Sequence, residues 1–148
     1  MENVETQFHT LSTIDNIGPI ALSVLWPAIA RLRDSDGGRV TNMVCKLVPT
    51  FCPDKGVTAR ILSAELAKNG INYNTRDNYK KLGTAGVPEL MRLLHETKTR
   101  RAALDILTAL GKDGEMAAKL VGTWIDYPDE AIREQARDAL AAFGTSEK

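Results

Sequence analysis

Residues 120–144 read LVGTWIDYPDEAIREQARDALAAFG and carry the pattern that decides the fold. Apolar residues recur every three or four positions on both sides of a central DYPD turn, which is the spacing of amphipathic helices. Pro128 suits the start of the second helix, and Asp129 and Glu130 lie where the helix dipole favours anions. Gly144 suits a position just past a helix end, where a left-handed conformation is wanted. This segment therefore predicts two helices joined by a turn.

An upstream segment repeats the pattern. Residues 90–111 read LMRLLHETKTRRAALDILTALG, with a shorter turn between two apolar stripes. At an offset of 33 residues the second helices align, which pairs Arg100 with Arg133, Ala103 with Ala136, Ile106 with Ala139, Leu107 with Leu140, Leu110 with Phe143 and Gly111 with Gly144. A period of this length that contains two helices indicates a repeat of helical hairpins.

The rest of the chain also has the helical period, and no stretch alternates as a strand would. Further helices are predicted around 22–32, where Pro27 should introduce a kink, and around 40–48, 61–66, 75–82, 87–94 and 116–125. Asn74 is expected to cap the helix over 75–82. We therefore expect an all-α fold in one domain over residues 1–148, with 1–15 and 145–148 as flexible tails.

On these residues the chain resembles the HEAT-repeat family. The shared features are an apolar first helix, an Asp-Pro turn, an apolar-Arg pair, and small and large apolar residues that end in Gly. The resemblance covers residues 86–144 and extends in part to 17–52. It implies a short α-solenoid of about four stacked two-helix hairpins. It also implies that Arg100 and Arg133 brace neighbouring turns through hydrogen bonds to carboxylates or carbonyls, and ligand binding is the alternative role for these two arginines.

Charge and hydropathy narrow the class of protein. The formal net charge is zero, which weakens the case for a nucleic-acid-binding protein, although a local basic face is compatible with it. The N-terminus is acidic and polar, unlike a signal peptide. The longest apolar stretch, residues 20–30, is shorter than the roughly 20 residues that span a bilayer. We therefore expect a cytoplasmic protein without membrane segments.

No motif in the sequence predicts catalysis or a bound metal. Cys45 and Cys52 are the only cysteines, and the two histidines have no ligand-like spacing to them. The DSDGG segment at 34–38 resembles the start of a calcium loop, but Arg39 and Cys45 replace its required Gly and Glu. The chain also lacks a phosphate-cradling Gly-Lys-Ser/Thr loop. We predict neither a cofactor nor a metal, and a protein that is not an enzyme.

Protein binding is the favoured function, because solenoids expose extended surfaces built from successive second helices. Their outward positions hold side chains of mixed charge, which suit a protein partner better than a phosphate backbone. An adaptor, an inhibitor or an immunity-type protein would all fit this interpretation. The candidate partner-binding residues are Arg101, Asp105, Thr108, Glu134, Arg137 and Asp138.

Nucleic-acid binding is the alternative, because residues 56–83 resemble a helix-turn-helix in Leu66, Ala67, Gly70, Ile71, Thr75 and Leu82. Residues 60–101 hold nine basic and four acidic residues, net +5, whereas 102–148 hold five and nine, net −4. The second helix would offer Asn74, Arg76, Asn78, Lys80 and Lys81 to a groove. The sequence leaves open whether 56–83 is a degenerate repeat or a helix-turn-helix, and it does not define the partner or the oligomeric state.

Overall fold

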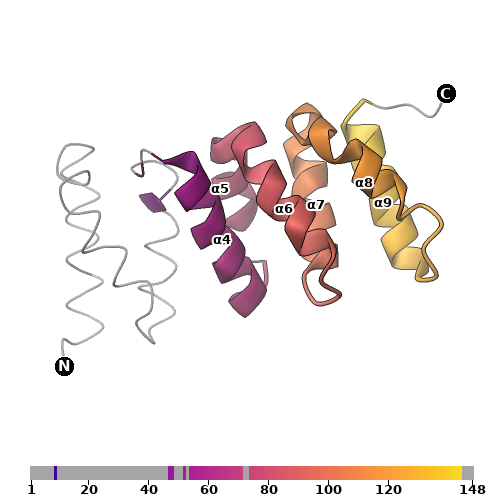
Figure 1. Cartoon of the computed structure of the whole chain (residues 1–148), viewed down its shortest axis with the longest axis horizontal. Helices are drawn as coiled ribbons and strands as arrows, with labels where there is room; N and C mark the ends of the chain where they lie inside the picture. The colour runs from indigo at the N-terminus through magenta and orange to yellow at the C-terminus, as the bar shows by residue number, and fades with distance from the viewer. Residues whose placement is uncertain (1–8, 10–46, 49–51, 53, 72–73, 145–148) are drawn as a thin grey trace. The chain divides into compact units, whose positions relative to one another are not determined.

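A computed structural model describes residues 9, 47–48, 52, 54–71 and 74–144 (Figure 1). The chain divides into two compact units, residues 1–58 and 59–148. In the first unit Leu47 and Val48 are helical and buried, and the Cys52 N–H donates to the Val48 carbonyl over 3.0 Å. The rest of the helices predicted around 22–32 and 40–48, and the two predicted tails apart from His9, lie outside the described residues.

Helix α4 spans Lys55–Asn69, with Asp54 directly before it and Gly70 directly after it. The Asp54 carboxylate accepts the Val57 N–H over 3.0 Å and so satisfies one of the backbone donors that every helix leaves at its start. Gly70 has a positive φ of 74°, a conformation that favours glycine. The predicted stripe over 61–66 is confirmed, because Ile61, Leu62 and Leu66 are buried.

Helix α5, Thr75–Leu82, has the predicted bounds and is linked to α4 by a buried hydrogen bond. The bond joins the hydroxyls of Ser63 and Tyr79 over 2.9 Å. Asn74 occupies the N-cap position, but its side chain makes no capping bond to the helix. Its backbone is already helical, with φ −89° and ψ −15°, whereas a capping residue is usually extended. The expected Asn74 cap is therefore wrong.

A short 3-10 helix, η1 (Gly83–Gly86), leads into the hairpin of α6 (Val87–Leu94) and α7 (Arg100–Leu110). Both stripes predicted for this hairpin are present. The fully covered aliphatic side chains of the two helices form a continuous core, which includes Leu90, Leu93, Leu94, Leu104, Ile106 and Leu107. Gly111 then ends α7 with a φ of 58°, in line with the predicted helix end.

The helix predicted around 116–125 differs from the structure. A 3-10 helix, η2 (Gly111–Ala117), is followed by α8 (Ala118–Gly122), and Trp124 lies in the turn beyond it. Gly114 packs so closely on the last helix that a Cβ there would lie 2.5 Å from Cε1 of Phe143. The tighter 3-10 path turns Met116 outward, and it is 61% exposed instead of buried.

Helix α9, Glu130–Ala142, begins two residues after Pro128, the predicted start, and Asp129 is its N-cap residue. Leu140, however, is only half-buried, whereas its repeat partner Leu107 is fully buried. Helix α7 packs against both α5 and α9, while α9 packs against α7 and α8. One side of α9 therefore faces solvent in the described part of the chain, and Leu140 does not have the full burial that its alignment with Leu107 predicts.

The second helices of the hairpins stand next to one another in the second unit, with α5 against α7 and α7 against α9 (Figure 1). Helices α6 and α8 pack on α7 and α9, respectively. The described residues contain helices and turns but no strand, so the predicted all-α class is confirmed for them. None of their helices has both the length and the apolar character needed to cross a bilayer.

Candidate functional site

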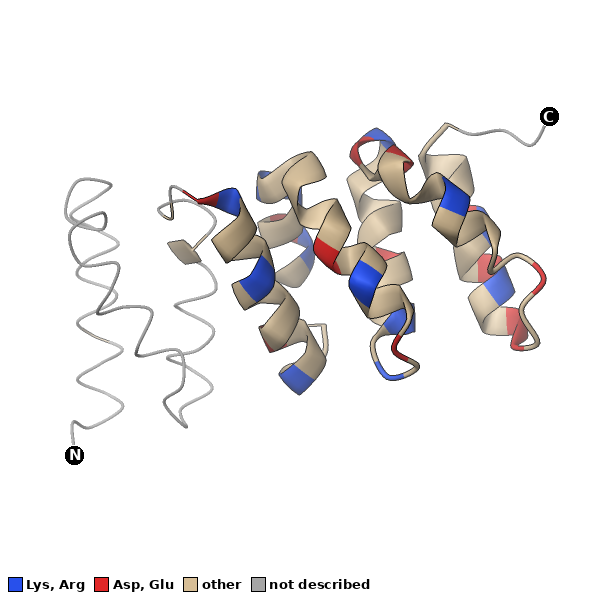
Figure 2. Cartoon of the chain, viewed as in Figure 1, with Lys and Arg blue, Asp and Glu red and all other residues tan. Residues whose placement is uncertain are grey.

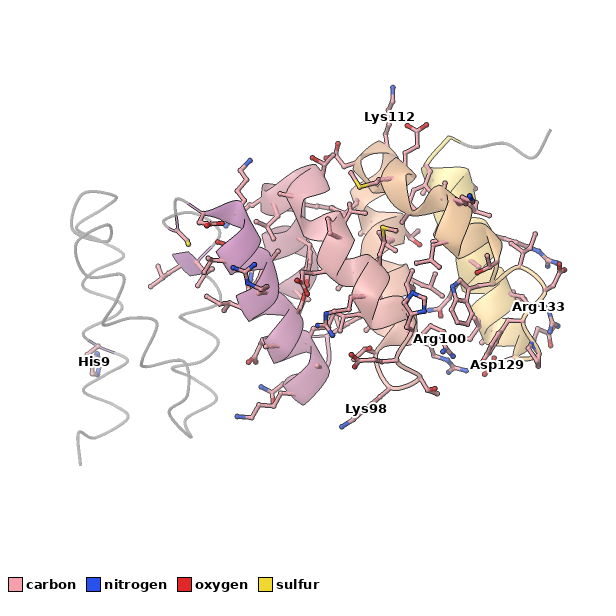
Figure 3. All side chains as sticks on the ribbon, viewed as in Figure 1. His9, Lys98, Arg100, Lys112, Asp129 and Arg133 are labelled. Carbon is pink, nitrogen blue, oxygen red and sulfur yellow. The ribbon has the colours of Figure 1, made fainter. Side chains whose placement is uncertain are left out.

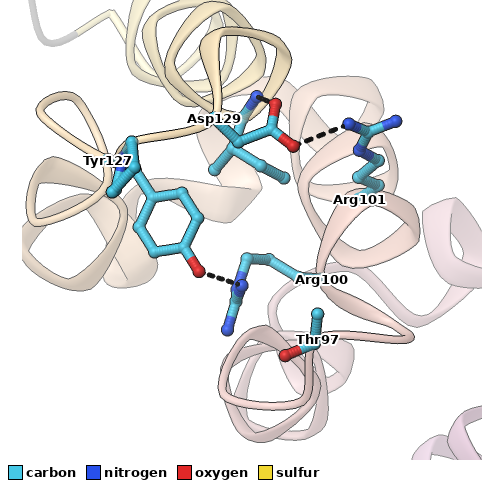
Figure 4. Close-up of a pocket in the computed structure, with 7 residues that line it drawn as sticks. Thr97, Arg100, Arg101, Tyr127 and Asp129 are labelled. Carbon is cyan, nitrogen blue, oxygen red and sulfur yellow. Dashed lines mark hydrogen bonds and ion pairs between the residues drawn. The ribbon is translucent and has the colours of Figure 1, made fainter.

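A pocket of about 320 Å³ opens between the loop after α6 and the loop before α9 (Figure 4). Side chains from both hairpins line it, so it exists only because α7 and α9 are adjacent. The lining residues are Thr97, Arg100, Arg101, Tyr127, Pro128, Asp129 and Ile132.

Arg100 forms the inner wall of the pocket and is only 6% exposed. Its Nε donates to the Leu94 carbonyl over 2.9 Å, one Nη donates to the Tyr127 hydroxyl over 3.0 Å, and the other reaches the His95 carbonyl at 3.5 Å. The guanidinium carbon lies 4.2 Å from the ring centre of Trp124 and 5.0 Å from that of Tyr127. Backbone, phenol and two aromatic faces therefore hold this cation in place.

Arg133 repeats part of this arrangement in the next hairpin. One of its Nη atoms donates to the carbonyls of Tyr127 and Pro128 over 2.9 and 3.0 Å. These acceptors precede Arg133 by six and five residues, the same separations at which Arg100 reaches Leu94 and His95. The bracing role that the family resemblance implies for the two arginines is therefore present, with carbonyls as the acceptors.

The pocket rim holds an ion pair between the two hairpins (Figure 4). An Nη of Arg101 lies 2.9 Å from Oδ2 of Asp129, whose other oxygen accepts the backbone N–H of Ala131 over 2.9 Å. Loss of solvent raises the pKa of the Asp129 carboxyl. This rise is smaller than the combined lowering of the pKa by the hydrogen bond and charge of Arg101 and by the backbone N–H groups of Ile132 and Ala131. The pKa of Asp129 consequently lies below its ordinary value of 3.8, so this carboxylate is ionised at neutral pH.

Positive charge at the start of α7 is only partly compensated. Thr99, its N-cap residue, makes no capping bond and instead donates its hydroxyl to the Leu93 carbonyl over 2.8 Å. Arg100 and Arg101 follow at the positive end of the helix dipole, where cations are unfavourable. No carboxylate of the described residues forms an ion pair with Arg100. The site is therefore suited to bind a group that carries negative charge.

The predicted partner-binding residues lie in different surroundings. Arg101 is in the rim ion pair, and Asp105 holds Arg76 of α5 through two hydrogen bonds of 2.6 and 2.8 Å. Thr108 is half-buried and donates its hydroxyl to the Leu104 carbonyl over 2.8 Å. The remaining three are exposed on α9, namely Glu134, Arg137 and Asp138.

The predicted nucleic-acid-binding residues are only partly available. Arg76 is engaged by Asp105, and Asn78 is 3% exposed, so its amide is not accessible to a groove. Lys80 and Lys81 are exposed, and Asn74 is half-buried. Figure 2 shows basic residues along α4 and acidic ones around the start of α9, in line with the charge difference in the sequence. The basic surface of α5 is thus smaller than the sequence predicted.

Of the lining residues, only Arg101 was a predicted binding residue, and ligand binding was the alternative role for Arg100. Sequence reasoning missed the other five as lining residues, namely Thr97, Tyr127, Pro128, Asp129 and Ile132. Arg100 and Asp129, both labelled in Figure 3, line one pocket although they belong to different hairpins. The offset of 33 residues contained a usable signal, because Tyr127 aligns with Leu94 and Pro128 with His95. At these two positions the backbone carbonyls accept hydrogen bonds from the arginine of the same hairpin, Arg100 in the first and Arg133 in the second.

Comparisons of the chain with protein-family models, with curated proteins and with solved structures find no match. Across the described positions, no group of three His, Cys, Asp or Glu residues could hold a metal ion. The geometry of the pocket itself therefore provides the evidence on what it binds.

Proposed function

We propose that this chain is a non-catalytic protein-binding module, a HEAT-like α-solenoid of about four hairpins, located in the cytoplasm. Its binding surface would be the row of second helices α5, α7 and α9. The main support for this proposal is that two ion pairs join neighbouring helices of this row. Arg76 pairs with Asp105 between α5 and α7, and Arg101 pairs with Asp129 between α7 and the start of α9. They leave a surface of alternating charge, which complements another protein better than a uniformly negative polymer.

Repetition of local structure supports the solenoid. Arg100 and Arg133 contact carbonyls at the same sequence separations, and Gly111 and Gly144 both have positive φ after an equivalent helix. Two hairpins with the same internal bonds and with adjacent second helices are what a stacked repeat requires.

The same contacts weigh against nucleic acid as the partner. A phosphate backbone binds tightly when several cations neutralise it, and each contact adds to the salt dependence of binding. Arg76 is already paired with Asp105, so of the charged residues predicted for a groove only Lys80 and Lys81 lack an ion-pair partner within the described chain. Two such lysines support a weak, non-specific interaction.

Partner capture from an extract of the source cells tests the proposal when three proteins are compared. They are the wild type, a variant with Glu134, Arg137 and Asp138 all changed to Ala, and a control with Lys80 and Lys81 changed to Ala. We expect one protein to co-purify with the wild type and the control, and at least tenfold less of it with the α9 variant.

A titration of labelled mixed-sequence duplex DNA at 100 mM salt provides the opposing test. We expect binding no tighter than roughly 0.1 mM, the weak end of non-specific contact. Micromolar binding that weakens steeply with salt and is lost on changing Lys80 and Lys81 would instead establish the nucleic-acid alternative.

A further inference from the structure

We propose that the pocket at Arg100 binds the carboxylate of a Glu or Asp side chain presented by the bound protein. This inference rests on the proposed function for the origin of the ligand, but its chemistry follows from the pocket alone. The pocket is separate from the exposed α9 residues of the proposed surface, since none of Glu134, Arg137 and Asp138 lines it.

Arg100 supplies the main reason. Its side chain is held rigidly by two loops and two aromatic rings, so little conformational entropy is lost when a ligand binds. The guanidinium has more N–H groups than these three hydrogen bonds use, and none of its partners is an anion. A buried cation without a counterion is energetically unfavourable, and a carboxylate that enters the pocket would relieve that cost.

A second donor beside this arginine belongs to Trp124, which is not among the residues that line the pocket. The indole Nε1 of Trp124, whose ring faces the guanidinium, is buried and has no acceptor in the described structure. The end of the Arg100 side chain lies between Tyr127 and Thr97 in Figure 4, among the residues that line the pocket. An anion with two acceptor oxygens therefore matches the polar groups that this region presents.

Net charge favours a carboxylate over a phosphate. Arg100 and Arg101 contribute two positive charges and Asp129 contributes one negative charge, which leaves the lining at +1. A carboxylate neutralises this charge. A phosphomonoester of charge near −2 would leave an excess of negative charge in the pocket and would be repelled more strongly by Asp129. The volume of about 320 Å³ is at the small end of ligand pockets and suits one side chain.

The direct test uses a blocked peptide, acetyl-Gly-Glu-Gly-amide, with acetyl-Gly-Gln-Gly-amide as its neutral match. Titration into the ¹⁵N-labelled full chain is followed by NMR at the Arg100 Nε–H and at the backbone amides of Thr97 and Asp129. We expect the Glu peptide to bind with a dissociation constant on the order of millimolar, as befits a single small anchor, and the Gln peptide to cause no saturable shift.

Two variants change the pocket charge while Arg100 remains in place. Asp129→Asn raises the lining to +2 and keeps a residue that caps helices well, so Glu-peptide affinity should rise about 3- to 30-fold and inorganic phosphate should begin to bind. Arg101→Gln lowers the lining to zero and should weaken the peptide by a similar factor. Arg60→Gln makes the same charge change on exposed α4, outside the pocket, and should leave the affinity unchanged.

Equal shifts from the Glu and Gln peptides, no shift from either, or affinities that do not follow the pocket charge would overturn the proposal. These outcomes are independent of partner capture. If the peptide binds but the α9 variant retains every captured protein, the proposed surface is wrong and the pocket stands. If protein capture depends on the α9 residues but the Glu peptide causes no chemical-shift change, the proposed carboxylate site is wrong and the proposed binding surface is retained.

Discussion

The starts of α7 and α9 occupy the same place in two successive hairpins, yet they differ in charge. At α9 the N-cap residue is Asp129, whose carboxylate accepts backbone N–H groups and pairs with Arg101. At α7 the N-cap is Thr99, which does not cap, and two arginines follow it. Arg133 is half-buried beside carbonyls alone, whereas Arg100 is enclosed between two aromatic rings.

Equivalent positions in the two hairpins therefore share one structural contact but differ in their surroundings. The contact from arginine to the carbonyls five and six residues earlier fastens a loop to the helix that follows it, and both hairpins have it. Neither arginine forms an ion pair with an acid in the described chain, so burial and the two aromatic rings are what set Arg100 apart as the proposed anion-binding copy. Paired substitutions in the two hairpins should measure how far they differ, with effects on stability that decrease from the core to the pocket rim.

The largest difference should lie in the core. Leu107→Ala removes a side chain that is fully buried and should lower the free energy of unfolding by about 2–5 kcal/mol. Leu140→Ala removes the equivalent side chain where it is already half-exposed, and should cost about half as much. Urea denaturation measures both, and equal costs would mean that α7 and α9 are covered to the same extent.

The repeat arginines should differ next. Arg100→Ala leaves the buried Leu94 carbonyl and the Tyr127 hydroxyl without a donor and removes two ring contacts, at a cost of about 3 kcal/mol. Arg133→Ala, which loses two carbonyl contacts at a more exposed site, should cost about 1 kcal/mol. Chemical denaturation of the two variants gives the comparison, and a larger effect at Arg133 would reverse our ranking of the two sites.

The contact between η2 and the end of α9, where Gly114 meets Phe143, can be tested by glycine-to-alanine substitutions. Gly114→Ala would place a methyl group against Phe143 and should destabilise the chain by about 2 kcal/mol, since the buried ring has to move. Gly122→Ala in α8 meets no atom within 4 Å and should stabilise the helix by about 0.5–1 kcal/mol. Thermal unfolding of the two variants should therefore shift in opposite directions, and destabilisation by Gly122→Ala would show that α8 is packed more tightly.

The smallest effect should be the pH dependence of the rim. Because the folded chain lowers the pKa of Asp129 below 3.8, its contribution to stability is complete above the unfolded pKa and is lost as pH falls through the folded one. The wild type should therefore lose more stability than Asp129→Asn between about pH 5 and pH 2. Urea midpoints at several pH values measure this, and parallel curves for the two proteins would contradict it.

Much of the helical architecture could be predicted from the sequence, because apolar spacing and glycine positions report local structure. The bounds of α5 were predicted correctly, and the start of α9 was predicted to within two residues. The segment after Gly111 was not, since its apolar residues fit a helical stripe while Gly114 has to contact Phe143. A contact between residues this far apart in the chain leaves no trace in local periodicity, so Met116 was misplaced.

The candidate site was less predictable for the same reason. Arg101, Asp105 and Arg76 were recognised as surface charges, but sequence reasoning assigned Arg76 and Asp105 to different binding functions, although they form one ion pair. Which acid meets which base depends on the stacking of α5, α7 and α9, which hydropathy does not encode. The pocket depends on that stacking too, because its walls come from two hairpins.

The ion pairs along α5, α7 and α9 also have a mechanical consequence. Both are largely solvent-exposed, with side-chain exposures of 55% and 27% for Arg76 and Asp105 and of 59% and 44% for Arg101 and Asp129. Such pairs are weak, and salt screens them over a length of about 8 Å at physiological ionic strength. The hydrogen bond between Ser63 and Tyr79 and the contacts of Arg100 are buried and therefore less sensitive to salt than the two ion pairs. Rising ionic strength should therefore loosen the contacts between α5, α7 and α9 at these exposed ion pairs before it affects the buried contacts.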